Sequence, residues 1–297
     1  MRIGALVGAL LVSAACDTGP GRLAVLVESP LYAVATGSGA KTMIVIHGGP
    51  GLRHDYLRPE FDALASEGRV VYYDQRGCGR SIEAGPFTWH QHVRDLKVLI
   101  VEILRLDRVT LIGSSWGAQL ALMFALVEPE LTETVVVSGL PSWPDSLVYR
   151  RSAERSDSMI QVALSQGLDS LTWQRAERRS RTERLDSAWM AQTQAASLGE
   201  ELAQRLGAMC RWVADDVHAS FATAPPVESL SALEIPVLVV HGARADRDAR
   251  TAQTLRSHLQ RGQVVSIPNA GHDPWHDVPS TFFSAVRAFI SGRHNSG

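Results

Sequence analysis

Short apolar runs alternate with longer amphipathic stretches along most of this chain of 297 residues. An uninterrupted apolar run predicts a strand that is buried on both faces, as in a parallel sheet. The predicted strands are residues 23–27, 31–35, 42–46, 69–73, 109–112, 134–137, 236–240 and 263–267.

Between these runs, apolar residues recur at the spacing of one helix face. The predicted core helices are residues 55–67, 88–106, 116–127, 248–260 and 279–291. Strands that alternate with helices indicate an α/β protein with a mostly parallel, doubly wound sheet.

The pattern changes after residue 140. Residues 141–229 contain no strand-like run and are rich in Arg, Glu, Ser, Ala and Gln at helical spacing. We therefore predict a helical cap at 141–229, inserted into a core formed by residues 22–140 and 230–297.

The first sixteen residues differ from the rest. Met1 and Arg2 precede an uncharged apolar run, residues 3–15, which is the arrangement of an export signal. The run is shorter than the roughly 20 residues that span a bilayer. Ser13-Ala-Ala-Cys16 resembles a bacterial lipoprotein processing site, so we predict a membrane tether through a lipidated Cys16. A secreted or periplasmic protein and an uncleaved start are the alternatives.

The composition indicates which classes of binding partner are not expected. The chain is 45% hydrophobic and 20% charged, with a formal net charge of −2, which gives no basic surface for nucleic acid. The other two cysteines, Cys78 and Cys210, lie far apart in sequence, and their pairing is left open. No spacing of histidines and cysteines predicts a metal, and no motif predicts a cofactor. The oligomeric state is not predicted.

The strongest chemical signal is Gly113-Ser-Ser-Trp-Gly117, a G-x-S-x-G turn between the strand at 109–112 and the helix at 116–127. In this motif the central serine lies on a strained corner with its hydroxyl exposed. The flanking glycines avoid a clash where strand and helix pass closely. Ser115 is therefore the predicted nucleophile.

A nucleophilic serine needs a base and an acid that orients the base. Loops that follow the last two predicted strands lie at the carboxyl edge of the sheet, where open α/β sheets bind ligands. His272 directly follows the last strand and is the predicted base. Asp246 is the predicted acid, because it is the first carboxylate after strand 236–240; Asp248 and Asp145 are the alternatives.

A glycine-rich loop, His47-Gly-Gly-Pro-Gly51, follows the strand at 42–46. An oxyanion needs two backbone N–H donors, and glycines let the backbone approach a substrate closely. We expect Gly49 to supply one donor and Trp116, the residue after the nucleophile, to supply the other.

Three motifs together carry a family resemblance: the loop at 47–51, Asp74-Gln-Arg-Gly-Cys-Gly-Arg-Ser81 and the turn at 113–117. The chain resembles the proline iminopeptidase-like family of α/β hydrolases, and Gly271-His272 stands where that family keeps its catalytic histidine. The resemblance implies the α/β-hydrolase fold with a helical cap, and a serine peptidase that removes an N-terminal residue, classically proline, from short peptides. It also implies that Asp74 and Arg76 brace the oxyanion loop.

Carboxylates of the cap bind the substrate ammonium in that family, and Asp215 and Asp216 are the best candidates here. An esterase or lactonase acting on small esters with the same triad is the alternative function. A non-catalytic, membrane-tethered binding protein is a third hypothesis. Epoxide hydrolase and haloalkane dehalogenase chemistry is disfavoured, because those relatives carry an aspartate where Ser115 stands.

Overall fold

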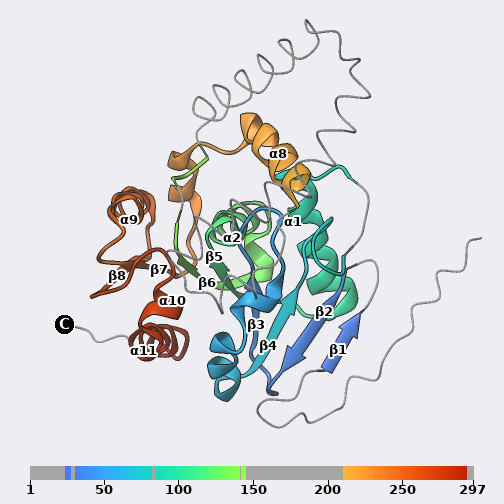
Figure 1. Cartoon of the computed structure of the whole chain (residues 1–297), viewed down its shortest axis with the longest axis horizontal. Helices are drawn as coiled ribbons and strands as arrows, with labels where there is room; N and C mark the ends of the chain where they lie inside the picture. Colours follow the sequence, from blue (N-terminus) through green and yellow to red (C-terminus); the bar gives the residue numbers. More distant parts are fainter. Residues whose placement is uncertain (1–23, 28–30, 82–84, 141, 145–209, 293–297) are drawn as a thin grey trace, which may run out of the picture.

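The computed structural model describes residues 24–27, 31–81, 85–140, 142–144 and 210–292 (Figure 1). The predicted export signal with Cys16, the alternative acid Asp145 and most of the predicted cap lie outside the described residues. The division into a core and a cap therefore stays a prediction.

Eight strands form one sheet in the order β1-β2-β4-β3-β5-β6-β7-β8. From β4 through β3 to β8 all neighbours are parallel, whereas β2 is antiparallel to both β1 and β4. The strands are β1 (Ala24–Val27), β2 (Ala33–Thr36), β3 (Thr42–Ile46), β4 (Arg69–Tyr73), β5 (Val109–Ser114), β6 (Thr132–Ser138), β7 (Val237–Gly242) and β8 (Gly262–Ile267). The predicted α/β class is confirmed.

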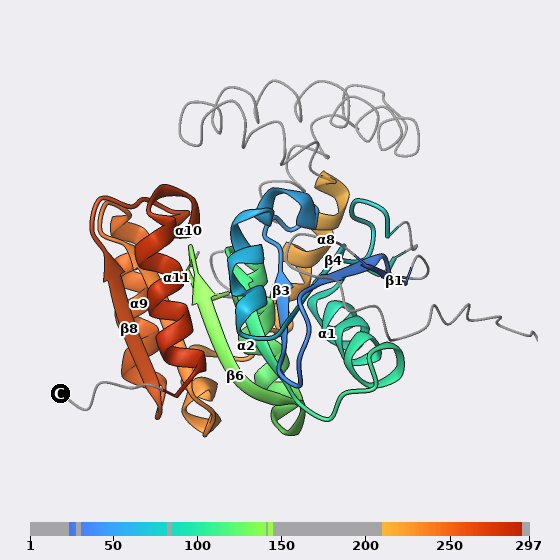
Figure 2. The same ribbon diagram turned by 90° about the horizontal axis from the view of Figure 1, so that it is seen from below.

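Helices cover both faces of this sheet. The α-helices are α1 (Trp89–Val98), α2 (Trp116–Val127), α8 (Arg211–Ser220), α9 (Asp246–His258), α10 (Pro274–Asp277) and α11 (Pro279–Ile290). One buried cluster joins the strands to α1, α2, α8 and α9, and a second joins their other face to α10 and α11. Figure 2 shows α9 and α11 beside β8, at the end of the sheet opposite β1. The sheet is therefore doubly wound, as the sequence predicted.

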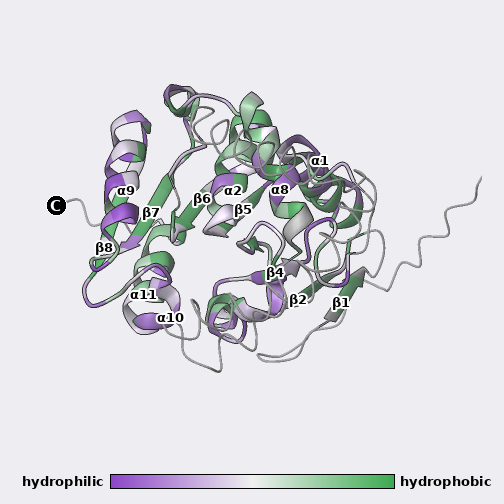
Figure 3. Ribbon diagram, turned by 45° about the horizontal axis from the view of Figure 1, so that its top comes forward, coloured by the Kyte–Doolittle hydropathy of each residue, from purple (hydrophilic) through white to green (hydrophobic). Residues whose placement is uncertain are grey.

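The burial of each strand follows its place in the sheet. Every residue of β3 and of β5 is buried, because these strands lie centrally between two helical layers. β8 is the edge strand, and most of its residues are at least partly exposed. The hydropathy colouring agrees, with the inner strands β6 and β7 green and much of the outer helix α9 purple or white (Figure 3).

Two predicted helices differ in detail. The predicted helix at 55–67 is two 3₁₀ segments, η1 (His54–Leu57) and η2 (Glu60–Ser66). Pro59 separates them, because proline lacks an N–H and disfavours a helical residue before it. The predicted helix at 88–106 ends its regular part at Val98 and continues as one π-helical segment, η3 (Leu99–Ile103).

Helix α8 is the part of the predicted insertion that returns to the core. Its buried Val213 and Val217 belong to the same cluster as α1 and α2. The backbone N–H of Cys210, just before α8, donates to the carbonyl oxygen of Gly51 at 2.8 Å. A Cβ on Gly51 would lie 2.4 Å from the Cys210 oxygen, so only glycine permits this approach. The start of α8 is thus bonded directly to the predicted oxyanion loop.

The remaining 3₁₀ segments among the described residues are η4 (Pro129–Leu131), η6 (Phe221–Thr223) and η7 (Val227–Ala232). Across the ranges that the structure describes, no helix has the length and apolar character needed to cross a membrane.

Candidate active site

Ser115 lies at the corner between β5 and α2 with φ 55° and ψ −122°. A residue other than glycine rarely adopts a positive φ, and such strain collects at functional sites. The N–H of Ser115 donates to the carbonyl oxygen of Ser138, at the end of β6, at 2.9 Å. The strained corner predicted from the motif is therefore confirmed.

The two glycines that flank this corner are required because no side chain fits at either position. A Cβ on Gly113 would lie 2.2 Å from the carbonyl oxygen of Gly117, and a Cβ on Gly117 would lie 2.1 Å from that of Ile46. Atoms cannot approach so closely, so α2 can leave the corner at this angle only with glycine at both positions. This confirms the close passage that the motif predicted.

His272 follows β8 and lies next to the same corner. An added Cβ on Gly139 would stand 3.5 Å from its Nε2, so the ring packs against Gly139. Ser138, the neighbour of Gly139, binds the N–H of Ser115. The end of β6 thus contacts both the serine backbone and the imidazole.

The structure pairs His272 with Asp248 and not with Asp246, the predicted acid. His272 Nδ1 lies 2.8 Å from Asp248 Oδ2. Asp248 is buried, whereas Asp246 is exposed. The loop after β7 ends earlier than expected and α9 begins at Asp246, so the two carboxylates are two residues apart on one helix. Residues at that spacing point to different sides of a helix.

The pair also sets the protonation of the base. A carboxylate only accepts hydrogen bonds, so Nδ1 of His272 carries the proton and Nε2 is left as an acceptor. Burial disfavours a charged ring, but the hydrogen bond that His272 donates to Asp248 and the charges of Asp273 and Asp248 outweigh it and raise the pKa of His272. The site therefore favours the imidazolium that forms when a base takes a proton.

Asp273 is a second carboxyl close to the base. Burial raises its pKa, and the attraction to His272 only partly offsets this. Its charge acts on the imidazole, but Nδ1–H of His272 donates its hydrogen bond to Asp248.

The loop at 47–51 packs directly against the elbow. A Cβ on Gly48 would lie 3.0 Å from Cβ of Ser115. The N–H of Gly48 donates to the hydroxyl oxygen of buried Tyr56 at 2.7 Å. This N–H is therefore engaged, which favours the next one, that of Gly49, as an oxyanion donor. Trp116 is the first residue of α2, where backbone N–H groups point away from the helix.

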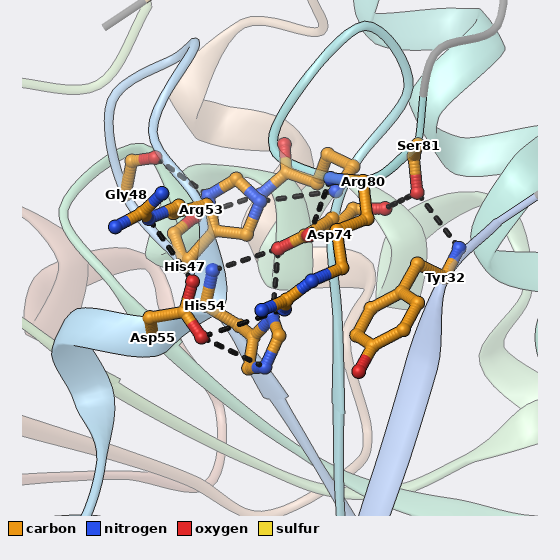
Figure 4. Close-up of polar contacts among 10 residues, drawn as sticks. Tyr32, His47, Gly48, Arg53, His54, Asp55, Asp74, Arg80 and Ser81 are labelled. Carbon is orange, nitrogen blue, oxygen red and sulfur yellow. Dashed lines mark hydrogen bonds and ion pairs between the residues drawn. The ribbon is translucent and has the colours of Figure 1, made fainter. Parts of the chain in front are cut away.

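Asp74 ties two loops together (Figure 4). Its Oδ1 accepts from the backbone N–H of His54 at 2.9 Å and lies 2.7 Å from Nδ1 of the same residue, while Oδ2 accepts from the N–H of Arg80 at 2.8 Å. Burial opposes its charge, yet the contacts with His54 lower the pKa of Asp74 to about 2. Asp74 thus links the segment after the oxyanion loop to the loop after β4.

Arg76 bonds to helix α1. It makes a two-pronged ion pair with Asp95 on α1, at 2.7 Å through both nitrogens. Arg76 therefore anchors the loop after β4 to α1; its bracing of the oxyanion loop, which the resemblance implied, stays a prediction.

Asp215 and Asp216 are exposed on α8. Their binding of a substrate ammonium stays a prediction. Cys78 is buried and Cys210 half-buried, and no disulfide joins them.

Sequence reasoning missed Gln75 and the role of Tyr56. Gln75 contacts both the oxyanion loop and Trp116, as described below. Its place inside the motif at 74–81 was the only sequence signal for it.

The eight-stranded sheet, the strained serine corner and the histidine–aspartate pair define an α/β hydrolase. The chain belongs to the alpha/beta hydrolase family, whose family model matches residues 43–286. It is a hydrolase similar to proline iminopeptidases.

Two curated relatives carry that name. The proline iminopeptidase of Saccharolobus solfataricus is 23% identical over 274 residues, which cover 84% of each chain. That of Thermoplasma volcanium is 41% identical over 106 residues, but these cover only 34% of this chain and 36% of the relative.

Solved structures share the fold. A thermophilic esterase from Thermogutta terrifontis superimposes with a TM-score of 0.66 at 24% identity, over 89% of this chain and 94% of that one. The proline iminopeptidase of Mycobacterium smegmatis gives a TM-score of 0.57 at 20% identity, over 91% and 98%. At these identities the likeness shows the fold alone.

Proposed function

We propose that this protein is a serine hydrolase that releases an N-terminal residue, proline or another small or apolar one, from short peptides or aminoacyl amides. The observation that carries the proposal is the pair of His272 with buried Asp248 beside the strained Ser115. The similarity to the Saccharolobus solfataricus proline iminopeptidase along 84% of both chains supports the substrate class.

The proposed reaction begins with proton transfer from Ser115 Oγ to His272 Nε2 as Oγ attacks the substrate carbonyl carbon. Asp248 accepts from Nδ1–H and stabilises the imidazolium. Negative charge develops on the carbonyl oxygen, where the N–H groups of Gly49 and Trp116 stabilise it. His272 then protonates the leaving amine and the C–N bond breaks, which leaves an acyl group on Ser115.

Water completes the cycle. His272 takes a proton from water, the resulting hydroxide equivalent attacks the acyl carbon, and Ser115 Oγ leaves with the proton returned by His272. The released N-terminal residue carries a new carboxylate. These steps use only groups of this chain and one water.

The second function, an ester hydrolase, uses the same triad. It is favoured by the exposure of Asp215 and Asp216, because a carboxylate that binds an ammonium tightly is better shielded from water. Purified enzyme and Ser115→Ala would be compared on prolyl-4-nitroanilide, other aminoacyl-nitroanilides and 4-nitrophenyl acetate. Turnover of an aminoacyl-nitroanilide that Ser115→Ala lacks is expected; ester turnover alone would overturn the peptidase proposal.

A binding protein without activity is tested by the same reagents. A fluorophosphonate probe is expected to label the wild type and not Ser115→Ala. Equal labelling of both would remove the hydrolase proposal altogether. We also propose that the protein is exported and tethered through Cys16, as the N-terminal sequence predicts.

A further inference from the structure

We propose that Gln75 is a positioning residue that holds the two oxyanion donors, Gly49 and Trp116, at a fixed separation. The inference rests on the proposed function, because it concerns the same acyl-transfer site.

Gln75 follows β4 and is 1% exposed. Its Oε1 accepts from the indole Nε1–H of Trp116 at 2.7 Å, and its Nε2 donates to the carbonyl oxygen of His47 at 2.7 Å. Its backbone N–H donates to Nε2 of His47 at 3.0 Å. One buried residue thus bonds both to the residue after the nucleophile and to the first residue of the oxyanion loop.

The orientation of this amide is determined by its partners. The Trp116 indole can only donate and the His47 carbonyl can only accept, so Oε1 must face Trp116 and Nε2 must face His47. A flipped amide would place a donor against a donor and an acceptor against an acceptor. The bridge therefore has one arrangement.

The same logic assigns His47. Its Nε2 accepts from Gln75, so the proton is on Nδ1, which lies 2.9 Å from the carbonyl oxygen of Gly48. Burial lowers the pKa of His47 to about 4, which keeps the ring neutral and Nε2 available as an acceptor. Through His47, the bridge reaches the residue that precedes Gly49.

The elements that carry the two donors are in contact. A Cβ on Gly117, next to Trp116, would lie 2.7 Å from the His47 carbonyl oxygen, the atom that Gln75 also binds. A shift of Gln75 therefore changes the position of the loop relative to the start of α2. Misplacement of catalytic groups by about 1 Å can cost on the order of 100-fold in rate.

Gln75→Glu tests the bridge with a side chain of the same shape. A protonated glutamic acid accepts from Trp116 and donates to the His47 carbonyl, as glutamine does. An ionised glutamate places a carboxylate oxygen against the carbonyl oxygen of His47, and both of these atoms can only accept hydrogen bonds. Burial raises the pKa of a carboxyl toward neutrality, so the loss should appear as the pH rises.

We expect kcat of Gln75→Glu on 4-nitrophenyl acetate to fall about 10- to 100-fold relative to wild type between pH 6 and pH 9, with KM little changed. Gln75→Met, which lacks both hydrogen bonds and any charge, should lose kcat to a similar extent at every pH. If Gln75→Glu does not fold, Gln75→Met still tests whether the hydrogen bonds of Gln75 are needed.

Gln119→Glu is the matched control. Gln119 is 2% exposed and its Nε2 also donates to a backbone carbonyl, that of Ser142, at 2.7 Å. Its ratio of kcat to wild type should not vary with pH. The inference is overturned if folded Gln75→Glu and Gln75→Met keep wild-type kcat, or if Gln119→Glu shows the same pH-dependent loss.

The wild type separates this inference from the proposed function. A wild type that neither turns over the ester nor reacts with a fluorophosphonate would overturn both. A reactive wild type with unchanged Gln75 variants would overturn only the role of Gln75.

Discussion

The carboxylate of Asp248 lies 2.8 Å from Nδ1 of His272, although the two residues come from segments that follow different strands of the sheet. Asp248 is on the first turn of α9, and His272 follows β8. The pairing distinguishes Asp248 from Asp246, a carboxylate two residues earlier in the sequence.

Asp248→Asn should lower kcat by on the order of 10⁴-fold, because the neutral amide does not stabilise the imidazolium and its NH2 group can hold His272 in the wrong tautomer. Asp246→Asn should stay within about two-fold, since that exposed side chain does not face His272. Steady-state kinetics on the best nitroanilide or ester substrate would measure both. The reverse ranking would return the acid role to Asp246.

The pH profile should report the same pair. The base must be neutral to act, so kcat/KM falls as the pH drops below the pKa of His272, which lies above its usual value. In Asp248→Asn the interactions that raise this pKa are weakened while burial still lowers it. The acidic limb should therefore move to lower pH. An unmoved limb would assign it to a different group.

Ser115→Gly should be more stable than Ser115→Ala by about 1 kcal/mol, because glycine adopts a positive φ without strain. Both variants lack the nucleophile, so the comparison isolates the backbone. Urea unfolding would measure the difference. Equal or reversed stabilities would mean that the corner stores no strain.

Asp74→Asn should destabilise the fold by about 2–4 kcal/mol at pH 7, because one amide nitrogen must face an N–H donor. The pKa of Asp74 is lowered to about 2 from 3.8, so its contribution is present above about pH 4 and is lost as the pH falls toward 2. The deficit of Asp74→Asn should thus shrink in acid. Denaturant unfolding at several pH values would show this.

Asp107→Asn is the control for that experiment, since Asp107 is exposed. A surface change of this kind should stay within about 0.5 kcal/mol at every pH. A deficit of Asp74→Asn that did not change between pH 7 and pH 3 would contradict the linkage.

Lipidation of Cys16 predicts incorporation of radiolabelled palmitate by the full chain in its host and none by Cys16→Ser. The wild type should also be found in the membrane fraction, and Cys16→Ser outside it. Failure of the wild type to take up label would leave a plain secreted signal as the better explanation.

The strands were the most predictable elements. The strands predicted at 42–46 and 69–73 each end in four consecutive apolar or aromatic residues, and β3 and β4 have those bounds. Ser115 was predictable because its motif combines a strand, two glycines and a helix. In each case the signal lies within a few neighbouring residues.

The aspartate that pairs with His272 and the contacts of Gln75 were less predictable from the sequence. The choice between Asp246 and Asp248 depends on where α9 begins, and one residue of difference turns the side chain away from His272. Gln75 and Trp116 are 41 positions apart, and their hydrogen bond depends on β4 and β5 lying on either side of β3. Contacts of that kind need the assembled sheet.

Gly51 and Cys210 share a backbone hydrogen bond across a gap that admits no side chain. Gly51 belongs to the loop predicted to bind the oxyanion, and Cys210 directly precedes α8, the helix by which the predicted insertion rejoins the core. The predicted insertion consequently cannot be replaced as a whole without breaking this contact. A donor segment transplanted from another hydrolase would have to stop before Cys210, so that α8 stays with the host scaffold.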